Sequence, residues 1–108
     1  MMNLEIVESN LKDGQVPPHQ LAIMKDWLAG YSSSLMDRQL ALQLNYATYF
    51  KLNREKVKSD KALKMEWLNT ESGKEESELE VIQKKIKLLR EAISSHLRVA
   101  DNQARNLY

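Results

Sequence analysis

Cysteine is absent from this chain of 108 residues, and glycine and proline are scarce. Without cysteine there is no disulfide and no thiolate metal site. The three glycines and two prolines leave few points at which a helix must stop. No apolar run approaches the roughly 18 residues needed to cross a bilayer, so we expect no membrane segment. The first residues lack the features of a signal peptide, and the sequence therefore predicts a cytoplasmic protein.

The composition that remains is that of an ordered, helical chain. Hydrophobic residues make up 43% of the sequence and charged residues 29%, which is typical of a folded domain. Asp13-Gly14 and Pro17-Pro18 form the clearest break, and they set apart a short amphipathic segment over residues 1–13. Leu4, Val7 and Leu11 give this segment the spacing of one helix face. We expect a single all-α domain over residues 1–108.

Two long helices are predicted after this segment. The first covers residues 18–69, and Gly30 with the serines at 32–34 leaves a kink open near residues 30–34. The second covers residues 74–105, because Ser72 and Glu75 have the spacing of a capping box. A short polar turn near Gly73 would join the two. The predicted architecture is a long antiparallel helical hairpin, similar to a coiled coil, with a short N-terminal helix.

Apolar surface exceeds what a hairpin of two helices can bury. One heptad seam follows the last helix through Leu79, Ile86 and Ile93, and a second apolar stripe runs beside it. The first long helix is apolar nearly all round from residue 40 to residue 52. We therefore expect a homo-oligomeric bundle, unless the N-terminal segment folds back over this surface. The predicted interface residues are Leu40, Leu44, Ala47, Phe50, Val81, Leu88, Ala92 and Val99.

Positive charge is concentrated in two windows, residues 51–64 and 81–94. Together they hold ten basic and three acidic residues, although the whole chain carries a net charge of only +1. A hairpin that turns near Gly73 would bring Lys58 close to Lys87 and Lys61 close to Lys84. Such like-charge neighbours favour an anionic partner, and single-stranded nucleic acid would release counterions on binding. The alternative is a lysine-rich outer face that only keeps a coiled coil soluble.

Enzymatic chemistry is not indicated by any motif. His19 and His96 lie far apart in the sequence and lack the spacing of a metal site. The glutamates at 75, 76, 78 and 80 suit a helix start, where the dipole favours negative charge. There is no glycine-rich phosphate loop and no nucleophile with a nearby base. We therefore predict no catalytic residue, no metal site and no cofactor.

A family resemblance covers residues 51–108. The run Lys58-Ser59-Asp60-Lys61-Ala62, then Trp67, Thr70 and Gly73, and the ending over residues 104–108 resemble a class of short helical-hairpin proteins encoded by bacteriophages. Those proteins are associated with replication and recombination gene clusters, and their function is mostly unassigned. The architecture is also similar to the T4-type recombination mediator, which is helical, oligomeric and binds single-stranded DNA. The resemblance implies a DNA-transaction accessory in the host cytoplasm, and it assigns no site residue.

Two hypotheses follow. In the first, an oligomeric, non-enzymatic protein binds single-stranded nucleic acid through a basic belt and assists recombination or replication proteins. In the second, the hairpin is a protein–protein adaptor or scaffold that binds no nucleic acid. The predicted nucleic-acid-binding residues of the first hypothesis are Lys51, Arg54, Lys58, Lys61, Lys64, Lys84, Lys85, Lys87 and Arg90.

Overall fold

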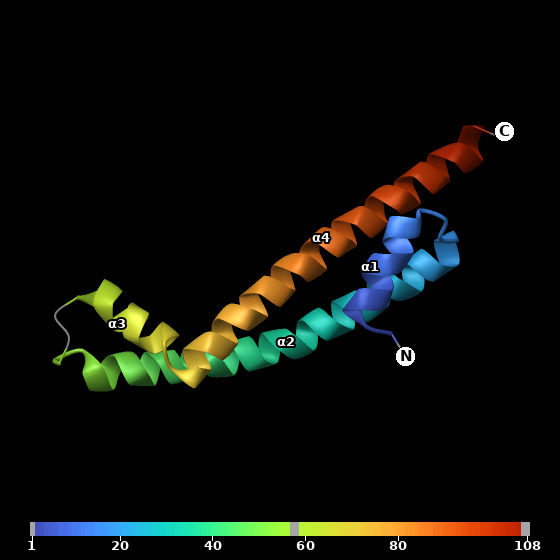
Figure 1. Cartoon of the computed structure of the whole chain (residues 1–108). Coiled ribbons are helices and arrows are strands. Elements are labelled where there is room, and N and C mark those ends of the chain that lie inside the picture. The colour runs from blue at the N-terminus through green and yellow to red at the C-terminus, as the bar shows by residue number, and fades with distance from the viewer. Residues whose placement is uncertain (1, 57–58, 107–108) are drawn as a thin grey trace. The chain divides into compact units, whose positions relative to one another are not determined.

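The computed structural model describes residues 2–56 and 59–106, with side chains as far as residue 102, and every regular element in those ranges is a helix. The helices are α1 (Leu4–Asp13), α2 (Pro18–Asn53), α3 (Asp60–Leu68) and α4 (Glu71–Asn106) (Figure 1). The all-α prediction is confirmed. The chain forms two compact units, and α2 and α4 each contribute to both. Unit 1 is Met1–Ser32 with Lys84–Tyr108, and unit 2 is Ser33–Gln83.

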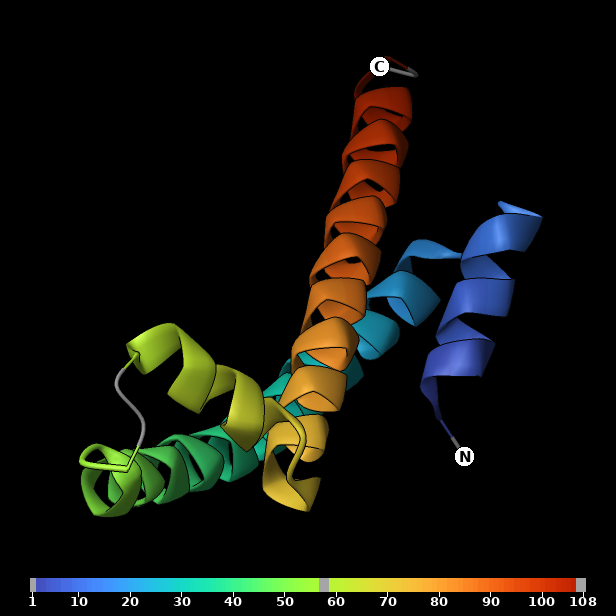
Figure 2. The same ribbon diagram turned by 60° about the vertical axis from the view of Figure 1, so that its left-hand side comes forward.

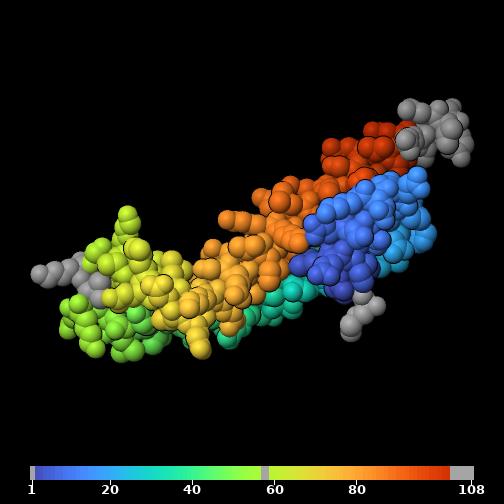
Figure 3. Space-filling view, in the orientation of Figure 1, coloured from blue at the N-terminus to red at the C-terminus, as the bar shows by residue number. Residues whose placement is uncertain are grey.

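Unit 1 combines α1, the first part of α2 and the later part of α4. The core side chains come from all three helices: Val7 from α1, Met24 and Leu28 from α2, and Ile86 and Ile93 from α4 are almost completely buried. In Figure 3 the atoms of α1 lie against early residues of α2 and late residues of α4. The heptad seam predicted for the last helix is therefore the buried face of α4 in this unit.

The ends of α1 are set by two local signals. The Asn3 side chain accepts a hydrogen bond from the Ile6 backbone N–H at 2.9 Å and caps the first turn. Gly14 ends the helix with a φ of +74°, a left-handed conformation that glycine adopts without steric cost. Val7 of α1 is buried within unit 1, and Leu40 and Leu44 of unit 2 are exposed. The apolar surface of residues 40–52 thus keeps Leu40, Leu44 and Leu52 exposed.

Unit 2 combines the later part of α2, α3 and the first part of α4. Figure 2 shows α3 folded back beside the end of α2. The side chains that hold it there are aromatic: the ring centroid of Trp67 lies 5.3 Å from that of Tyr46 and 5.4 Å from that of Tyr49. Leu42 and Leu63 of this unit are buried as well.

The predicted continuous helix over residues 18–69 is wrong after Asn53. It continues through Gly30 and the serines, but it ends at Asn53, and α3 begins only at Asp60. Two side chains favour the interruption locally. Asn53 Nδ2 donates to the Tyr49 carbonyl at 2.8 Å, and Ser59 Oγ accepts from the Ala62 N–H at 3.4 Å as the cap of α3. The interruption lets Trp67 reach the tyrosines of α2, which a straight helix would prevent.

The start of α4 also differs from the prediction. The helix begins at Glu71, and its first-turn hydrogen bond is made by Thr70, whose Oγ1 accepts from the Gly73 N–H at 3.1 Å. The same hydroxyl donates to the Trp67 carbonyl at 2.6 Å. Ser72 is therefore inside the helix, and the predicted capping box with Glu75 is wrong. The turn at residues 69–70 joins α3 to α4, so α2 and α4 are not the two arms of a simple hairpin.

Gly73 is needed for close packing. A Cβ atom at this position would lie 1.9 Å from the Trp67 carbonyl oxygen. Only a residue without a side chain allows the first turn of α4 to approach the end of α3 so closely. Gly73 thus fixes the α3–α4 corner rather than a hairpin turn.

Candidate interaction surfaces

The predicted basic belt is divided between the two units. Lys51, Arg54, Lys61 and Lys64 belong to unit 2, whereas Lys84, Lys85, Lys87 and Arg90 belong to unit 1. Lys58 lies outside the described residues. The expected neighbours, Lys61 with Lys84 and Lys58 with Lys87, followed from a turn that joined two long helices directly. Because α3 lies between α2 and α4 in the chain, that register does not follow.

Lys64 binds two side chains within unit 2. Its ammonium nitrogen donates to Glu76 Oε1 at 3.1 Å and lies 4.2 Å from the ring centroid of Tyr46. The other oxygen of Glu76 accepts from Trp67 Nε1 at 3.2 Å. Glu76 is only 9% exposed, so these two donors compensate a buried charge. We therefore remove Lys64 from the candidate nucleic-acid contacts.

Lys85 in unit 1 is also engaged. Its Nζ lies 2.9 Å from Glu8 Oε2, which links α4 to α1. The hydrogen bond and the charge of Lys85 lower the pKa of Glu8. Lys84 and Lys87 are exposed, and with Leu88 and Glu91 they line a shallow depression. Arg90 is exposed as well, so three of the four basic residues of this unit remain accessible.

A second interhelical ion pair ties α2 to α4 within unit 2. The Arg38 guanidinium binds the Glu75 carboxylate through two nitrogens, with Nη2 2.9 Å from Oε1. The hydrogen bond from Arg38 lowers the pKa of Glu75, and the same contact raises the pKa of Arg38. Glu75 was predicted to be half of a capping box, and its observed partner is instead a side chain on another helix.

A cluster of free cations remains at the α2–α3 connection. We call Lys51, Arg54, Lys56 and Lys61 the basic tip. All four are exposed, and within the described ranges none of them pairs with a carboxylate. Arg54 lies over the Phe50 ring, 5.8 Å from its centroid. Lys56 belongs to the basic window 51–64, but it was not among the predicted site residues, and its exposure adds it to them.

The predicted interface residues are mostly exposed. In unit 2, Leu40 and Leu44 are 57% and 61% exposed, and Ala47 and Val81 are exposed too. In unit 1, Leu88 and Val99 are exposed. Two members of the set are partly buried, namely Phe50 and Ala92. The second stripe of α4 is therefore largely solvent-facing, as a binding surface would require.

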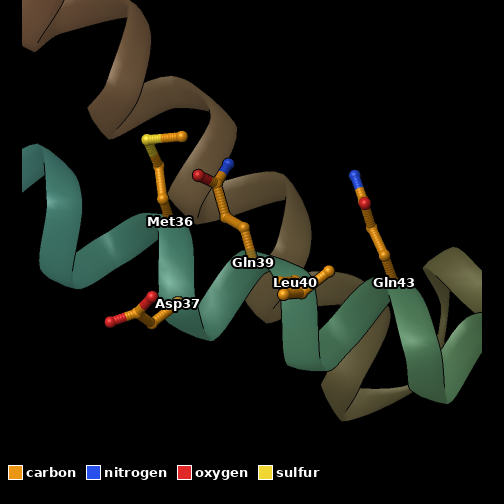
Figure 4. A pocket seen from close by; sticks show the side chains of 5 residues that line it. All are labelled: Met36, Asp37, Gln39, Leu40 and Gln43. Carbon is orange, nitrogen blue, oxygen red and sulfur yellow. The ribbon is translucent and has the colours of Figure 1, made fainter.

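One further apolar residue joins this surface. Met36 of α2 is 60% exposed, one turn before Leu40, and was not predicted. We call Met36, Leu40, Leu44 and Ala47 the apolar stripe. Figure 4 shows the beginning of it, where Met36, Asp37, Gln39, Leu40 and Gln43 line a shallow depression of about 400 Å³. The spacing of three to four residues along the stripe was visible in the sequence, but the exposure of Met36 was not.

No metal site is apparent in the parts of the chain that the structure describes. No group of three or more His, Asp and Glu side chains there could hold a metal ion. His19 and His96 are both exposed. Across the same residues, no helix is both long and apolar enough to cross a membrane.

Comparisons with protein-family models, with curated proteins and with solved structures find no match to this chain. The resemblance to helical-hairpin phage proteins therefore stays a prediction, as do the recombination or replication partners that it implies.

Proposed function

We propose that this chain is a non-enzymatic helical scaffold protein that assembles with a second copy of itself through the apolar stripe of unit 2. The observation that carries the proposal is the exposure of Met36, Leu40 and Leu44 on successive turns of α2. A single exposed leucine is ordinary, but a row of large apolar side chains is typical of a binding surface.

The absence of charge along this part of the helix supports the proposal. No residue from 39 to 50 carries a charge, in a chain of which 29% is charged. A surface helix that served only solubility would interrupt the stripe with lysine or glutamate. Burial of one leucine or methionine side chain contributes about 1.5–3 kcal/mol, so covering this stripe in an interface would offset part of the cost of association.

The mass in solution tests the proposal. We expect sedimentation equilibrium to give a mass above the 12.5 kDa of one chain, rising with concentration. Leu44→Asp should return the protein to a monomer, because it places a charge in the interface. Leu88→Asp is the matched control, since Leu88 is similarly exposed but lies on α4 in unit 1. A wild-type monomer at about 100 μM, in the weak range of affinities, would contradict the proposal.

Binding of single-stranded nucleic acid is a second candidate, favoured by one observation. The basic tip contains four exposed cations for which no carboxylate partner occurs in the described ranges, and one of them, Arg54, lies over the partly buried Phe50 ring. Cations that face solvent without partners can bind phosphates and release their counterions. The aromatic residues Tyr46 and Tyr49 pack on Trp67, so base stacking on them is not part of this candidate.

Fluorescence anisotropy with a labelled oligothymidine tests the second candidate. We expect binding at low salt that weakens steeply as salt rises, and that is lost in the double variant Lys56→Glu/Lys61→Glu. The double variant Lys84→Glu/Lys87→Glu carries the same change in charge within unit 1 and should bind as the wild type does. Equal losses in both variants would indicate a general charge effect and would exclude the basic tip as a site.

A further inference from the structure

The apolar stripe is bounded by two opposite charges. Asp37 and Lys51 are both exposed, and neither makes an ion pair within the residues that the structure describes. Each lies seven residues from Leu44, one toward the beginning of α2 and one toward its end. Seven residues along a helix change the direction of a side chain by only about 20°, so both charges share the face of Leu44.

The positions of these charges distinguish two ways of pairing the stripe. In a parallel pair of α2 helices, Asp37 would face Asp37 and Lys51 would face Lys51, and both contacts would repel. In an antiparallel pair centred on Leu44, each Asp37 would face Lys51 of the second copy. At about 1.5 Å per residue, the two ion pairs would lie roughly 21 Å apart, one at each end of the apolar contact.

The charged residue beside Asp37 already has a partner. Arg38, the next basic residue, points its guanidinium to Glu75 in its own unit. The residues between the two charges that share this face are Leu40, Leu44, Ala47 and the uncharged Thr48, and Gln43 borders them. A two-fold symmetric contact requires a surface that is complementary to itself, which an apolar centre with one acidic and one basic end provides.

We propose that two copies of this chain associate antiparallel through α2, with Leu44 at the two-fold axis and Asp37 of each copy paired with Lys51 of the other. The inference rests on the proposed self-association and adds its polarity and register. The ends of the stripe specify the orientation, because the reversed arrangement replaces two attractions with two repulsions.

Charge reversal tests the polarity. In the antiparallel pair, Asp37→Lys and Lys51→Asp each turn two attractions into two repulsions, so each should raise the dimer dissociation constant about tenfold at low salt. The double variant Asp37→Lys/Lys51→Asp should return it to the wild-type value. If the single variants dissociate as the wild type does, the helices are parallel or the charges lie outside the interface, and the proposal is overturned.

Cysteine cross-linking tests the register, and the native chain contains no cysteine that would interfere. Leu44→Cys should form a disulfide between copies under mild oxidation, because the two positions meet at the axis. Leu40→Cys is the matched control: in the antiparallel pair, its copies lie roughly 12 Å apart along the axis, beyond the ~7 Å limit for Cα atoms of a disulfide. Cross-linking of both variants indicates a parallel pair and overturns the proposal.

The experiments test the self-association and the register separately. A wild-type dimer that Leu44→Asp dissociates, but in which Leu44→Cys does not cross-link, keeps the self-association and overturns the register. A wild-type chain that remains monomeric overturns both. Dimers that persist in Leu44→Asp place the contact elsewhere and exclude the apolar stripe as the interface.

Discussion

Unit 1 and unit 2 are each built from parts of three helices, yet different side chains hold them together. Unit 1 buries aliphatic residues from every helix, with Val7, Met24 and Ile93 at its centre. Unit 2 buries fewer aliphatic residues and depends on Trp67 and the hydrogen-bonded Glu76. The short helices show the contrast: α1 buries one small aliphatic side chain, Val7, whereas α3 buries Leu63 and the large ring of Trp67. In unit 2, the Trp67 ring therefore forms much of the core, which in unit 1 consists of several aliphatic residues.

The largest expected effect is the loss of that ring. Trp67→Ala should lower the free energy of unfolding by about 3–5 kcal/mol, the usual cost of removing a buried tryptophan. Tyr46 and Tyr49 lose their contact, and Glu76 loses a donor. Trp27→Ala is the control from unit 1, where the ring is only half-buried against Tyr31, and it should cost less. Urea titration followed by circular dichroism measures both, and equal costs would contradict the comparison.

Replacing two glycines by alanine should change the stability in opposite directions. In unit 2, Gly73→Ala places a Cβ against the Trp67 carbonyl oxygen, and we expect a loss of roughly 2 kcal/mol or more because the backbone must shift. Gly30 of unit 1 lies inside α2, and a Cβ atom added there would have no atom within 4 Å. Gly30→Ala should raise the stability by about 0.5–1 kcal/mol, since alanine favours the helix. Thermal melts of both variants measure the contrast, and a stabilised Gly73→Ala would refute the close approach.

The smallest expected effect is a pH dependence that both units share. The pKa of Glu8 in unit 1 and that of Glu75 in unit 2 are lowered by their cationic partners. A carboxylate with a lowered pKa stabilises the folded state above its ordinary pKa, and this contribution is lost as the pH falls below about 4.5. Stability should therefore decline on acidification.

Replacing the cation of each ion pair by a neutral residue tests which pair causes this decline in stability. Arg38→Gln and Lys85→Gln should each make the loss of stability between about pH 5 and pH 2 shallower, because one carboxylate returns to its ordinary pKa. Lys74→Gln removes an exposed cation that makes no ion pair among the described residues, and it should leave the slope unchanged. Urea titrations across this pH range provide the measurement, and identical slopes in all variants would show that neither pair contributes.

Sequence patterns predicted unit 1 better than unit 2. The seam through Ile86 and Ile93 depends on helix periodicity alone, and both residues are buried as expected. The end of α2 at Asn53 could not be predicted in the same way. Its local signals, an asparagine and Ser59, are weak beside a run of strong helix formers. The interruption is stabilised by Trp67 packing on tyrosines far away in the sequence, and periodicity does not report such contacts.

The candidate surfaces divide similarly. The exposure of Leu40, Leu44 and Leu88 was predicted from an excess of apolar faces over partner helices, and it is observed. Whether an individual lysine binds a carboxylate or faces solvent was not predictable, because it depends on where α3 lies. Lys64 and Lys61 are three residues apart, yet one is bound to Glu76 and the other faces solvent. Charge counts in a window therefore overestimate the cations that are free to bind a partner.

The placement of the two tryptophans gives each unit its own optical reporter. Trp27 belongs to unit 1 and Trp67 to unit 2, and the chain contains no other tryptophan. Replacing either one by phenylalanine leaves an emission signal that arises from one unit alone. Because α2 and α4 run through both units, the two single-tryptophan proteins can reveal whether these helices unfold in one step or whether one half melts while the other stays folded.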